Sequence, residues 1–283
     1  MRVSPRTVGD WSASRRHVIL SAVRALLLSG LVATASLAGP VIVIDPGHGG
    51  AQDGASSAGG LLEKNLALSI AKKLKAKLEA DLEAKVKLTR DGDARLHLDE
   101  RVMLANRQRP DLFVSIHANS MPTATQRRVN EGIETYFLSA AASGEDAKKV
   151  AARENAEARQ QAKGPSSDTL AFILADLQKS EAHHDSSRLA YSVHESLIAG
   201  TGAQDRGVQQ APFYVLMGLE APAVLIEVGF VSHPKEGARL GEAKYQEQVA
   251  ESIASGIKAF LAQVDARERK RSEGVVPAPE AGK

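Results

Sequence analysis

The stretch VIVIDPGHGG, residues 41–50, decides how the rest of the chain is organised. Its first four residues are apolar and β-branched, which predicts a strand covered on both faces of a sheet. Directly after this strand His48 stands among glycines, where the backbone carries few side chains. Because ligands in open α/β sheets bind at the carboxyl ends of the strands, we expect His48 to lie at a binding site.

Outward from this strand, apolar strands alternate with amphipathic helices. Leucine and isoleucine recur at every fourth position from 66 to 78, which predicts a helix that begins at Glu63. Further strands are expected at 85–90, 112–117, 132–139, 213–216 and 223–230, and further helices at 98–109, 186–200 and 244–264. This alternation predicts a three-layer α/β/α sandwich with a mostly parallel, mixed central sheet and an inserted helical segment.

The N-terminus is not expected to belong to this sandwich. Residues 1–38 combine a basic region, an apolar run and small residues, which is the layout of a signal peptide cleaved after Ala35 or Ala38. The adjacent Arg15 and Arg16 resemble a twin-arginine export signal. An uncleaved membrane anchor is the alternative. In both cases we expect an exported protein of the periplasm or cell envelope.

The remainder reads as one domain with two additions. We assign residues 39–265 to this domain and a helical insertion to about 140–185, which is rich in Ala, Glu, Lys and Gln. Residues 266–283 are charged and contain proline, and we expect a disordered tail.

Composition and charge limit the partners. The net charge is +2, but residues 1–38 hold five arginines and one aspartate, a net of +4, so the remainder is near +2 − 4 = −2. A faintly acidic body with 4% aromatic residues offers no footprint for nucleic acid, and we expect none as a partner. The chain has no cysteine, so it contains neither disulfides nor thiolate ligands.

Polar residues near the ends of the predicted strands form a candidate metal site. His48 follows the first strand, His117 ends LFVSIH, and Glu227 stands inside the apolar run AVLIEVGF, while Glu63 opens the first helix. Each has an ordinary structural explanation alone, although an unpaired buried carboxylate is costly. One cation at the strand ends explains all four together.

Zinc is the cation that best fits these residues. Catalytic zinc takes three protein ligands of the His/His/carboxylate kind and keeps an open position, and His48, Glu63 and His117 supply that set. Glu227 remains as an acid that can move the proton of a metal-bound water. The glycines around His48 let the backbone and a substrate approach the metal closely.

Seven blocks of sequence, in order, carry a resemblance to a known family. The blocks are IDPGHGGAQDGA, EKNLALSIAKKLKAKLEA, VKLTRDGD, ERVMLANRQRPDLFVSIHANS, GIETYFLS, DRGVQQAPFYVL and PAVLIEVGFVSHPKE. Over about residues 41–264 the chain resembles the zinc-dependent N-acetylmuramoyl-L-alanine amidases, the type 3 cell-wall amidases of the Gram-negative cell-division type. The resemblance implies that residues 39–265 form a catalytic amidase domain.

The same resemblance implies roles for the candidate residues. His48, Glu63 and His117 match the family's ligands of a single zinc ion, and Glu227 matches its catalytic glutamate. The implied reaction is hydrolysis of the amide between N-acetylmuramic acid and L-alanine in peptidoglycan, for cell-wall remodelling and daughter-cell separation. A zinc peptidase that cuts within the stem peptide is the alternative enzyme, and a binding protein with an inactive zinc site is the alternative outside catalysis.

Four further residues are weaker candidates. Asp45 is a candidate for orienting His48, and Asn119 and Arg206 for contacting or supporting the substrate. Ordinary hydrogen bonding at strand ends explains them equally well. His233 stands where the family usually has asparagine, and we expect a solvated loop residue.

The insertion exceeds what the minimal fold needs. Resembling amidases of Gram-negative cell-division systems carry an inserted helical segment that covers the zinc until an activator binds. Residues 168–184 predict an amphipathic helix whose acidic side chains could reach the metal. We therefore hypothesise autoinhibition that a protein activator relieves, with a surface decoration as the alternative.

Overall fold

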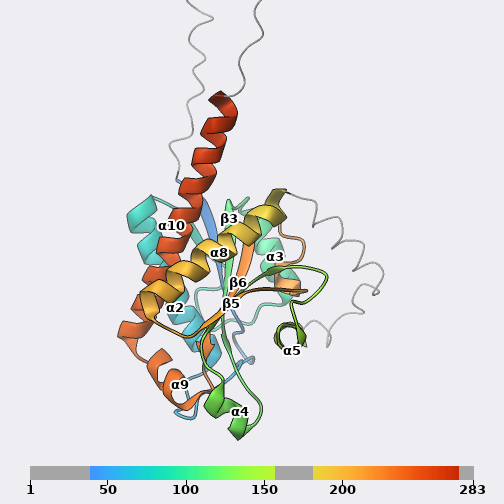
Figure 1. Cartoon of the computed structure of the whole chain (residues 1–283), viewed down its shortest axis with the longest axis vertical. Helices are drawn as coiled ribbons and strands as arrows, with labels where there is room; N and C mark the ends of the chain where they lie inside the picture. Colours follow the sequence, from blue (N-terminus) through green and yellow to red (C-terminus); the bar gives the residue numbers. More distant parts are fainter. Residues whose placement is uncertain (1–38, 157–180, 274–283) are drawn as a thin grey trace, which may run out of the picture. The chain divides into compact units, whose positions relative to one another are not determined.

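The computed structural model describes residues 39–156 and 181–273 (Figure 1). The strands are β1 (Val41–Pro46), β2 (Lys85–Leu88), β3 (Leu112–Asn119), β4 (Ile133–Leu138), β5 (Asp205–Ala211) and β6 (Ala223–Phe230). The helices are α2 (Glu63–Leu82), α3 (Leu98–Arg107), α4 (Ala124–Val129), α5 (Glu145–Glu154), α8 (Glu181–Thr201), α9 (Pro234–Leu240), α10 (Ala243–Glu273) and the 3₁₀ turn η1 (Tyr214–Leu216). The predicted signal peptide, residues 1–38, lies outside the described residues.

The described strands form one mixed sheet in the order β2-β1-β3-β6-β4-β5. β2, β1, β3 and β6 run parallel to one another, whereas β4 is antiparallel to β6 and parallel to β5. In this register His117 pairs with Glu227, and Glu227 pairs with Glu134. Three polar side chains therefore form a row across β3, β6 and β4, on one face of the sheet.

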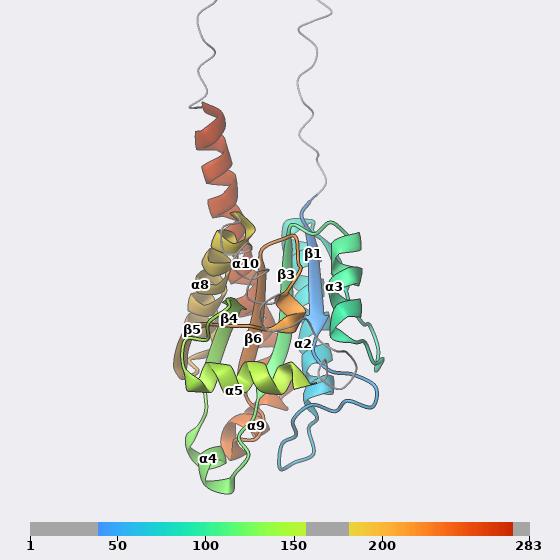
Figure 2. The same ribbon diagram turned by 90° about the vertical axis from the view of Figure 1, so that its right-hand side faces the viewer.

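Helices cover both faces of the sheet (Figure 2). α2, α8 and α10 pack against one face, where Ile44 and Val114 belong to the larger core cluster. On the other face, Val43, Phe113 and Leu225 share a second cluster with residues of α3, α5 and η1. Figure 2 shows α5 crossing the strands near the end at which β1 terminates. The predicted α/β/α sandwich with a mostly parallel, mixed sheet is confirmed.

One predicted strand is wrong, and one strand was missed. Residues 213–216 were predicted as a strand, but three of them form η1, and Val215 and Leu216 are buried beside α3. The missed strand is β5, with the sequence DRGVQQA. As an edge strand it pairs only with β4, so it lacks the apolar pattern that identifies a central strand.

Helix α10 is longer than predicted and continues to Glu273. Residues 266–273 are therefore helical, which corrects the expected disordered tail over that range, while residues 274–283 lie outside the described residues. The reason is a charge contact with α8: Arg267 donates two hydrogen bonds, of 2.8 and 2.7 Å, to the carboxylate of Asp185. Arg271 also lies 3.8 Å from Glu181, the first residue of α8.

Helix α5 lies within the predicted insertion at 140–185. The amphipathic helix predicted at 168–184 falls mostly on residues 157–180, outside the described part of the chain. Over residues 39–156 and 181–273, none of the helices has the length and apolar character needed to cross a membrane.

Candidate metal centre

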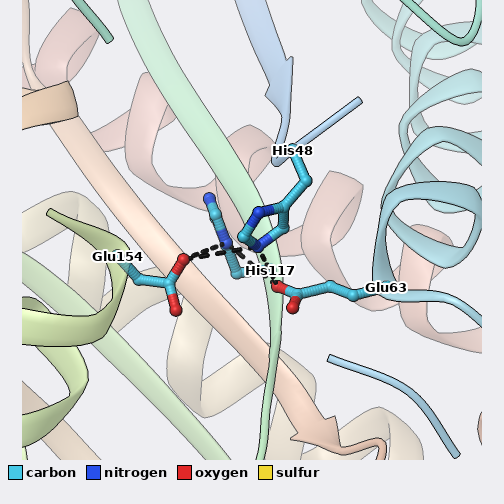
Figure 3. A group of neighbouring side chains, drawn as sticks. All are labelled: His48, Glu63, His117 and Glu154. Carbon is cyan, nitrogen blue, oxygen red and sulfur yellow. Dashed lines mark hydrogen bonds and ion pairs between the residues drawn. The ribbon is translucent and has the colours of Figure 1, made fainter. Parts of the chain in front are cut away.

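Four side chains from four separate elements converge at the end of the sheet (Figure 3). His48 follows β1, Glu63 is the first residue of α2, His117 belongs to β3, and Glu154 is the last residue of α5. One donor atom from each lies within 4.8 Å of the other three. Nδ1 of His117 is 3.0 Å from Oε1 of Glu63 and 3.0 Å from Oε2 of Glu154. The structure thus brings the three predicted ligands together and adds a fourth donor.

Glycines make this close approach possible. A Cβ atom at Gly47 would collide with the imidazole of His117. A Cβ atom at Gly54 would lie 2.6 Å from Oε2 of Glu63 and 2.6 Å from Cδ2 of His48. His48 itself has a φ of 57°, in the left-handed region that costs a non-glycine residue free energy. The glycine-rich turn therefore allows the His48 imidazole to reach the other three donors.

The carboxylate of Glu63 is held by backbone N–H groups from two sides. The N–H of Ala55 donates to Oε2 at 2.8 Å, and the N–H of Ala118 donates to Oε1 at 3.0 Å. As the first residue of α2, Glu63 also lies where the helix dipole favours a negative charge. These contacts fix the orientation of a side chain that is almost completely buried.

The two imidazoles and two carboxylates perturb one another strongly. Burial by itself lowers the pKa of His48, but the carboxylates of Glu63 and Glu154 raise it to about 9. The same carboxylates raise the pKa of His117 well above its usual value, against the effect of burial. Conversely, burial raises the pKa of Glu63 and Glu154, but the histidines hold both below the usual range. Without a metal ion, the imidazoles of His48 and His117 therefore hold protons near neutral pH. These protons must leave when a metal ion binds.

The donor set fits a zinc ion. Nε2 of His48 and Oε2 of Glu154 are buried, and they lie 3.0–3.4 Å from other donors of the same cluster without making hydrogen bonds among the described residues. Because buried polar atoms normally make hydrogen bonds, this arrangement is better satisfied by a cation held between the four donors. Imidazole nitrogens together with carboxylate oxygens are ligands that zinc favours.

Glu227 lies beside this cluster and is completely buried on β6. Its Oε1 accepts a hydrogen bond of 3.3 Å from Nη2 of Arg153 on α5, and its Oε2 has no hydrogen-bond partner among the described residues. Burial raises the pKa of Glu227 to about 8, with Glu154 and Glu63 adding to the rise and Arg153 opposing it. An acid with this pKa is suited to exchanging a proton near neutral pH.

Asp45 acts on the His48 loop indirectly. Its carboxylate accepts hydrogen bonds from Arg101 at 2.8 Å, Thr89 at 2.5 Å and Ser115 at 2.9 Å, rather than from His48. Arg101 in turn donates to the backbone carbonyl of His48 at 2.7 Å. Asp45, a candidate for orienting His48, therefore reaches the backbone of the His48 loop through the buried Arg101, and no hydrogen bond joins it to the imidazole among the described residues.

Asn119 and Arg206 meet at Glu134, next to the metal centre. Nδ2 of Asn119 donates to Oε2 of Glu134 at 2.9 Å, and Nε of Arg206 donates to Oε1 at 2.6 Å. Oδ1 of Asn119 accepts a hydrogen bond of 3.0 Å from Nη1 of Arg153. Both candidates therefore belong to a polar network that reaches Glu227 through Arg153.

Helix α5 packs on the sheet through an apolar face, and Asn155 holds its C-terminal end by hydrogen bonds. Ala147, Val150 and Ala151 are buried in the second core cluster. Nδ2 of Asn155 donates to the carbonyl of Pro212 at 2.6 Å, and its Oδ1 accepts from the N–H of Tyr214 at 2.8 Å. These contacts place the last turn of α5 over the metal centre.

The sequence did not identify Arg153 and Glu154, which occur in a stretch of Ala, Glu and Arg typical of any exposed helix. The sequence signal that pointed to them was the presence of the insertion. Within it, the acidic residues considered as able to reach the metal were those at 168–184. Sequence reasoning also misjudged His233, which is buried at the start of α9, where its Nδ1 accepts a hydrogen bond of 3.1 Å from the N–H of Glu236.

Comparison with known proteins assigns the chain to a family. A profile described as N-acetylmuramoyl-L-alanine amidase matches residues 42–259. The chain is 35% identical over 224 residues to the N-acetylmuramoyl-L-alanine amidase AmiC of Neisseria meningitidis, an alignment that covers 78% of this chain and 53% of that protein. This chain thus spans about half the length of that relative.

Solved structures agree with the sequence relatives. The N-acetylmuramoyl-L-alanine amidase of Clostridium difficile 630 is 30% identical with a TM-score of 0.62, and the alignment covers 80% of this chain and 98% of that one. The CwlD amidase of Clostridioides difficile, solved in complex with the GerS lipoprotein, is 25% identical with a TM-score of 0.58, over 79% of this chain and 98% of that one. Because the family profile spans nearly the whole sandwich that carries the metal centre, the chain belongs to the N-acetylmuramoyl-L-alanine amidase family.

Proposed function

We propose that this protein is a zinc-dependent amidase that cleaves the bond between N-acetylmuramic acid and L-alanine in peptidoglycan. The observation that carries the proposal is the convergence of His48, Glu63 and His117 beside the buried acid Glu227. Membership of the amidase family supports the substrate class.

His48, Glu63 and His117 would hold one zinc ion through two imidazole nitrogens and a carboxylate oxygen. When bound, such an ion polarises a carbonyl group and lowers the pKa of a coordinated water to about 7. The two histidines serve as ligands only when neutral, so they lose their protons as the metal binds. The backbone contacts of Glu63 and the buried Arg101 keep the three donors in place.

Glu227 carries the proton in this proposal. A nearby dication favours the ionised carboxylate and lowers a pKa that burial has raised. The carboxylate then accepts a proton from the attacking water and returns it to the departing amine of L-alanine. Glu227→Gln keeps the shape of the side chain without its basicity, so activity should fall by about 10²–10⁴-fold.

Helix α5 closes the site in the conformation described here. Catalytic zinc sites keep one position open, whereas Glu154 adds a fourth protein donor to the other three. Arg153, the residue before it, pairs with Glu227. Substrate therefore requires α5 to move, and we propose that the protein is autoinhibited until a protein activator captures the inserted segment.

Location and partner belong to the same proposal. Residues 1–38 have the layout of an export signal, and peptidoglycan lies outside the cytoplasm, so we place the protein in the cell envelope or periplasm, in cell-wall remodelling and daughter-cell separation. The solved complex of the CwlD amidase with the GerS lipoprotein supports a protein partner for a member of this family.

The test is digestion of purified peptidoglycan by zinc-loaded protein, with product analysis by mass spectrometry. Wild type, Glu154→Ala and the double variant Glu154→Ala/Glu227→Gln are compared at equal measured zinc content. We expect Glu154→Ala to release peptides with a free L-alanine amino terminus faster than wild type, and the double variant to release almost none. Fragments cut within the stem peptide would instead establish a peptidase and contradict the proposed bond.

A further inference from the structure

The guanidinium of Arg153 donates to Oε1 of its neighbour Glu154 through Nε, at 2.8 Å, and its two terminal nitrogens donate to acceptors outside α5. Its Nη1 donates to Oδ1 of Asn119 at 3.0 Å and to the backbone carbonyl of Ser120 at 3.1 Å. Its Nη2 donates to Oε1 of Glu227 at 3.3 Å. We call Oδ1 of Asn119, the carbonyl of Ser120 and the carboxylate of Glu227 the acceptor cradle.

The orientation of the cradle does not depend on α5. Nδ2 of Asn119 donates to Oε2 of Glu134 at 2.9 Å, which fixes the amide so that its oxygen faces the opposite side. The N–H of Ser120 also donates to Oδ1 of Asn119, at 2.7 Å. Asn119 and Glu227 are both buried, and the second carboxylate oxygen of Glu227 has no partner within the described residues. Movement of α5 therefore removes the guanidinium donors from these three acceptors and leaves them able to accept hydrogen bonds from other N–H groups.

We infer that the acceptor cradle binds N–H groups on the peptide side of the scissile bond, so that Arg153 occupies the place of the leaving peptide. This inference rests on the proposed amidase function. Glu154 places a carboxylate oxygen at the metal centre, where the scissile carbonyl oxygen would lie, and Arg153 places nitrogen beside Glu227, where the departing nitrogen would lie. Asn119 and Ser120 are then positioned for the next amide N–H along the peptide.

The shape of the surface fits this direction. A groove of about 630 Å³ continues from Asn119 and Ser120 along the segment that contains Met121 and Gln126. In the closed conformation its other wall is α5, through Lys149 and Val150, so movement of α5 would widen the groove. The stem peptide would therefore run along the loop between β3 and β4, and the glycan would leave the metal centre on the other side. Asn119 becomes a specificity-determining residue for the peptide, with no contact to the glycan.

The test measures hydrolysis and binding in one set of variants. Arg153→Ala/Glu154→Ala serves as the background, with Asn119→Leu added to it, and with Asn106→Leu on α3 as the matched control. The substrates are N-acetylmuramyl-L-alanyl-D-isoglutamine, which has an amide N–H after L-alanine, and N-acetylmuramyl-L-alanine, which lacks it. Saturation-transfer NMR measures binding of the free dipeptide L-alanyl-D-isoglutamine to the zinc-loaded proteins.

We expect Asn119→Leu to lower kcat/KM for the dipeptide substrate about threefold to tenfold, which is the effect of one hydrogen bond, and to change the shorter substrate less than twofold. Dipeptide binding should weaken by a similar factor, and Asn106→Leu should change neither quantity. An equal loss on both substrates, or no loss on either, overturns the inference, as does a background variant that binds no dipeptide. If dipeptide binding depends on Asn119 but neither substrate is hydrolysed, the acceptor cradle is supported and the proposed amidase function is rejected.

A second comparison leaves Asn119 untouched, in case its replacement disturbs folding. The dipeptide should bind to Arg153→Ala/Glu154→Ala at least about tenfold more tightly than to Glu154→Ala, since only the latter keeps the competing guanidinium. Equal binding to the two proteins would show that Arg153 does not occupy the peptide's place.

Discussion

At the scale of single residues, Gly47 shows how closely the metal centre is packed. A side chain at this position would meet the ring of His117. Gly47→Ala should therefore displace the imidazole and weaken zinc binding by about 10–100-fold, the range seen when the support of a metal ligand is lost. Competition with a chelator measures the affinity. Gly92→Ala is the control, because nothing lies within 4 Å of its added Cβ, and equal zinc affinity in the two variants would contradict the geometry.

The imidazoles predict a pH dependence of zinc binding. Because the pKa of His48 is raised to about 9, it is protonated in the metal-free protein at neutral pH and must lose that proton to bind zinc. Zinc affinity should therefore rise from pH 6 to pH 9, with proton release visible as a buffer-dependent heat in calorimetry. Glu154→Gln removes one of the two carboxylates that raise this pKa, so the slope should become shallower. An affinity that does not change over this range would contradict the assignment.

Asp45 predicts a pH dependence of stability. Burial alone would raise its pKa, but Arg101 and the hydrogen bond from Thr89 hold it below the usual value. Such a group contributes stability above its unfolded pKa, about 3.9, and loses it as the pH falls through the folded value. Asp45→Asn leaves the buried Arg101 without its counter-charge and should cost about 3–5 kcal/mol at pH 7. Chemical denaturation from pH 2 to 7 should show this difference shrinking below about pH 4; a constant difference would refute it.

Single residues also mark the limit of sequence reasoning about the site. His48 and His117 could be predicted because strand ends in α/β sheets gather at one place, and Glu227 because an acid inside an apolar strand needs a partner. Arg101 could not, because on the sequence it is one charged residue of an amphipathic helix. Its burial depends on where α3 meets the loop after β1, which no local pattern records.

At the scale of elements, helix α5 contributes residues both to the second core cluster and to the candidate metal centre. Its last turn depends on Asn155, which binds the backbone at Pro212 and Tyr214. Asn155→Ala removes both hydrogen bonds and should weaken the closed position by about 2 kcal/mol, roughly a thirtyfold shift toward the open state. We expect basal peptidoglycan hydrolysis to rise, while the thermal midpoint of the sandwich changes little. Lys148→Ala, an exposed change on the same helix, is the control.

Basal activity of Asn155→Ala at or below the wild-type level, in a folded and zinc-loaded protein, would show that α5 does not limit the reaction.

The strands and long helices were predictable because each buries a regular apolar face. The edge strand β5 and the helix α5 were not, since β5 has a polar sequence and α5 buries mostly alanine. The insertion was predicted to be helical from its composition, but the composition gave neither the bounds of α5 nor its position over the candidate site.

At the scale of the whole described domain, the larger apolar core and the candidate site lie on opposite faces of the sheet. One face of the sheet, under α2, α8 and α10, is a continuous apolar core. The other face carries the polar row of His117, Glu227 and Glu134, and α5 covers the metal centre at its end. We infer that α5 can move without exposing the larger core, as the proposed autoinhibition requires.

The most direct test of the central claim is anomalous diffraction at the zinc edge from crystals of the zinc-loaded protein. We predict one zinc peak among the donor atoms of His48, Glu63, His117 and Glu154, at about 2.0–2.2 Å from each. A peak elsewhere, or no peak among these atoms at full zinc content, would contradict both the metal centre and its closure by α5.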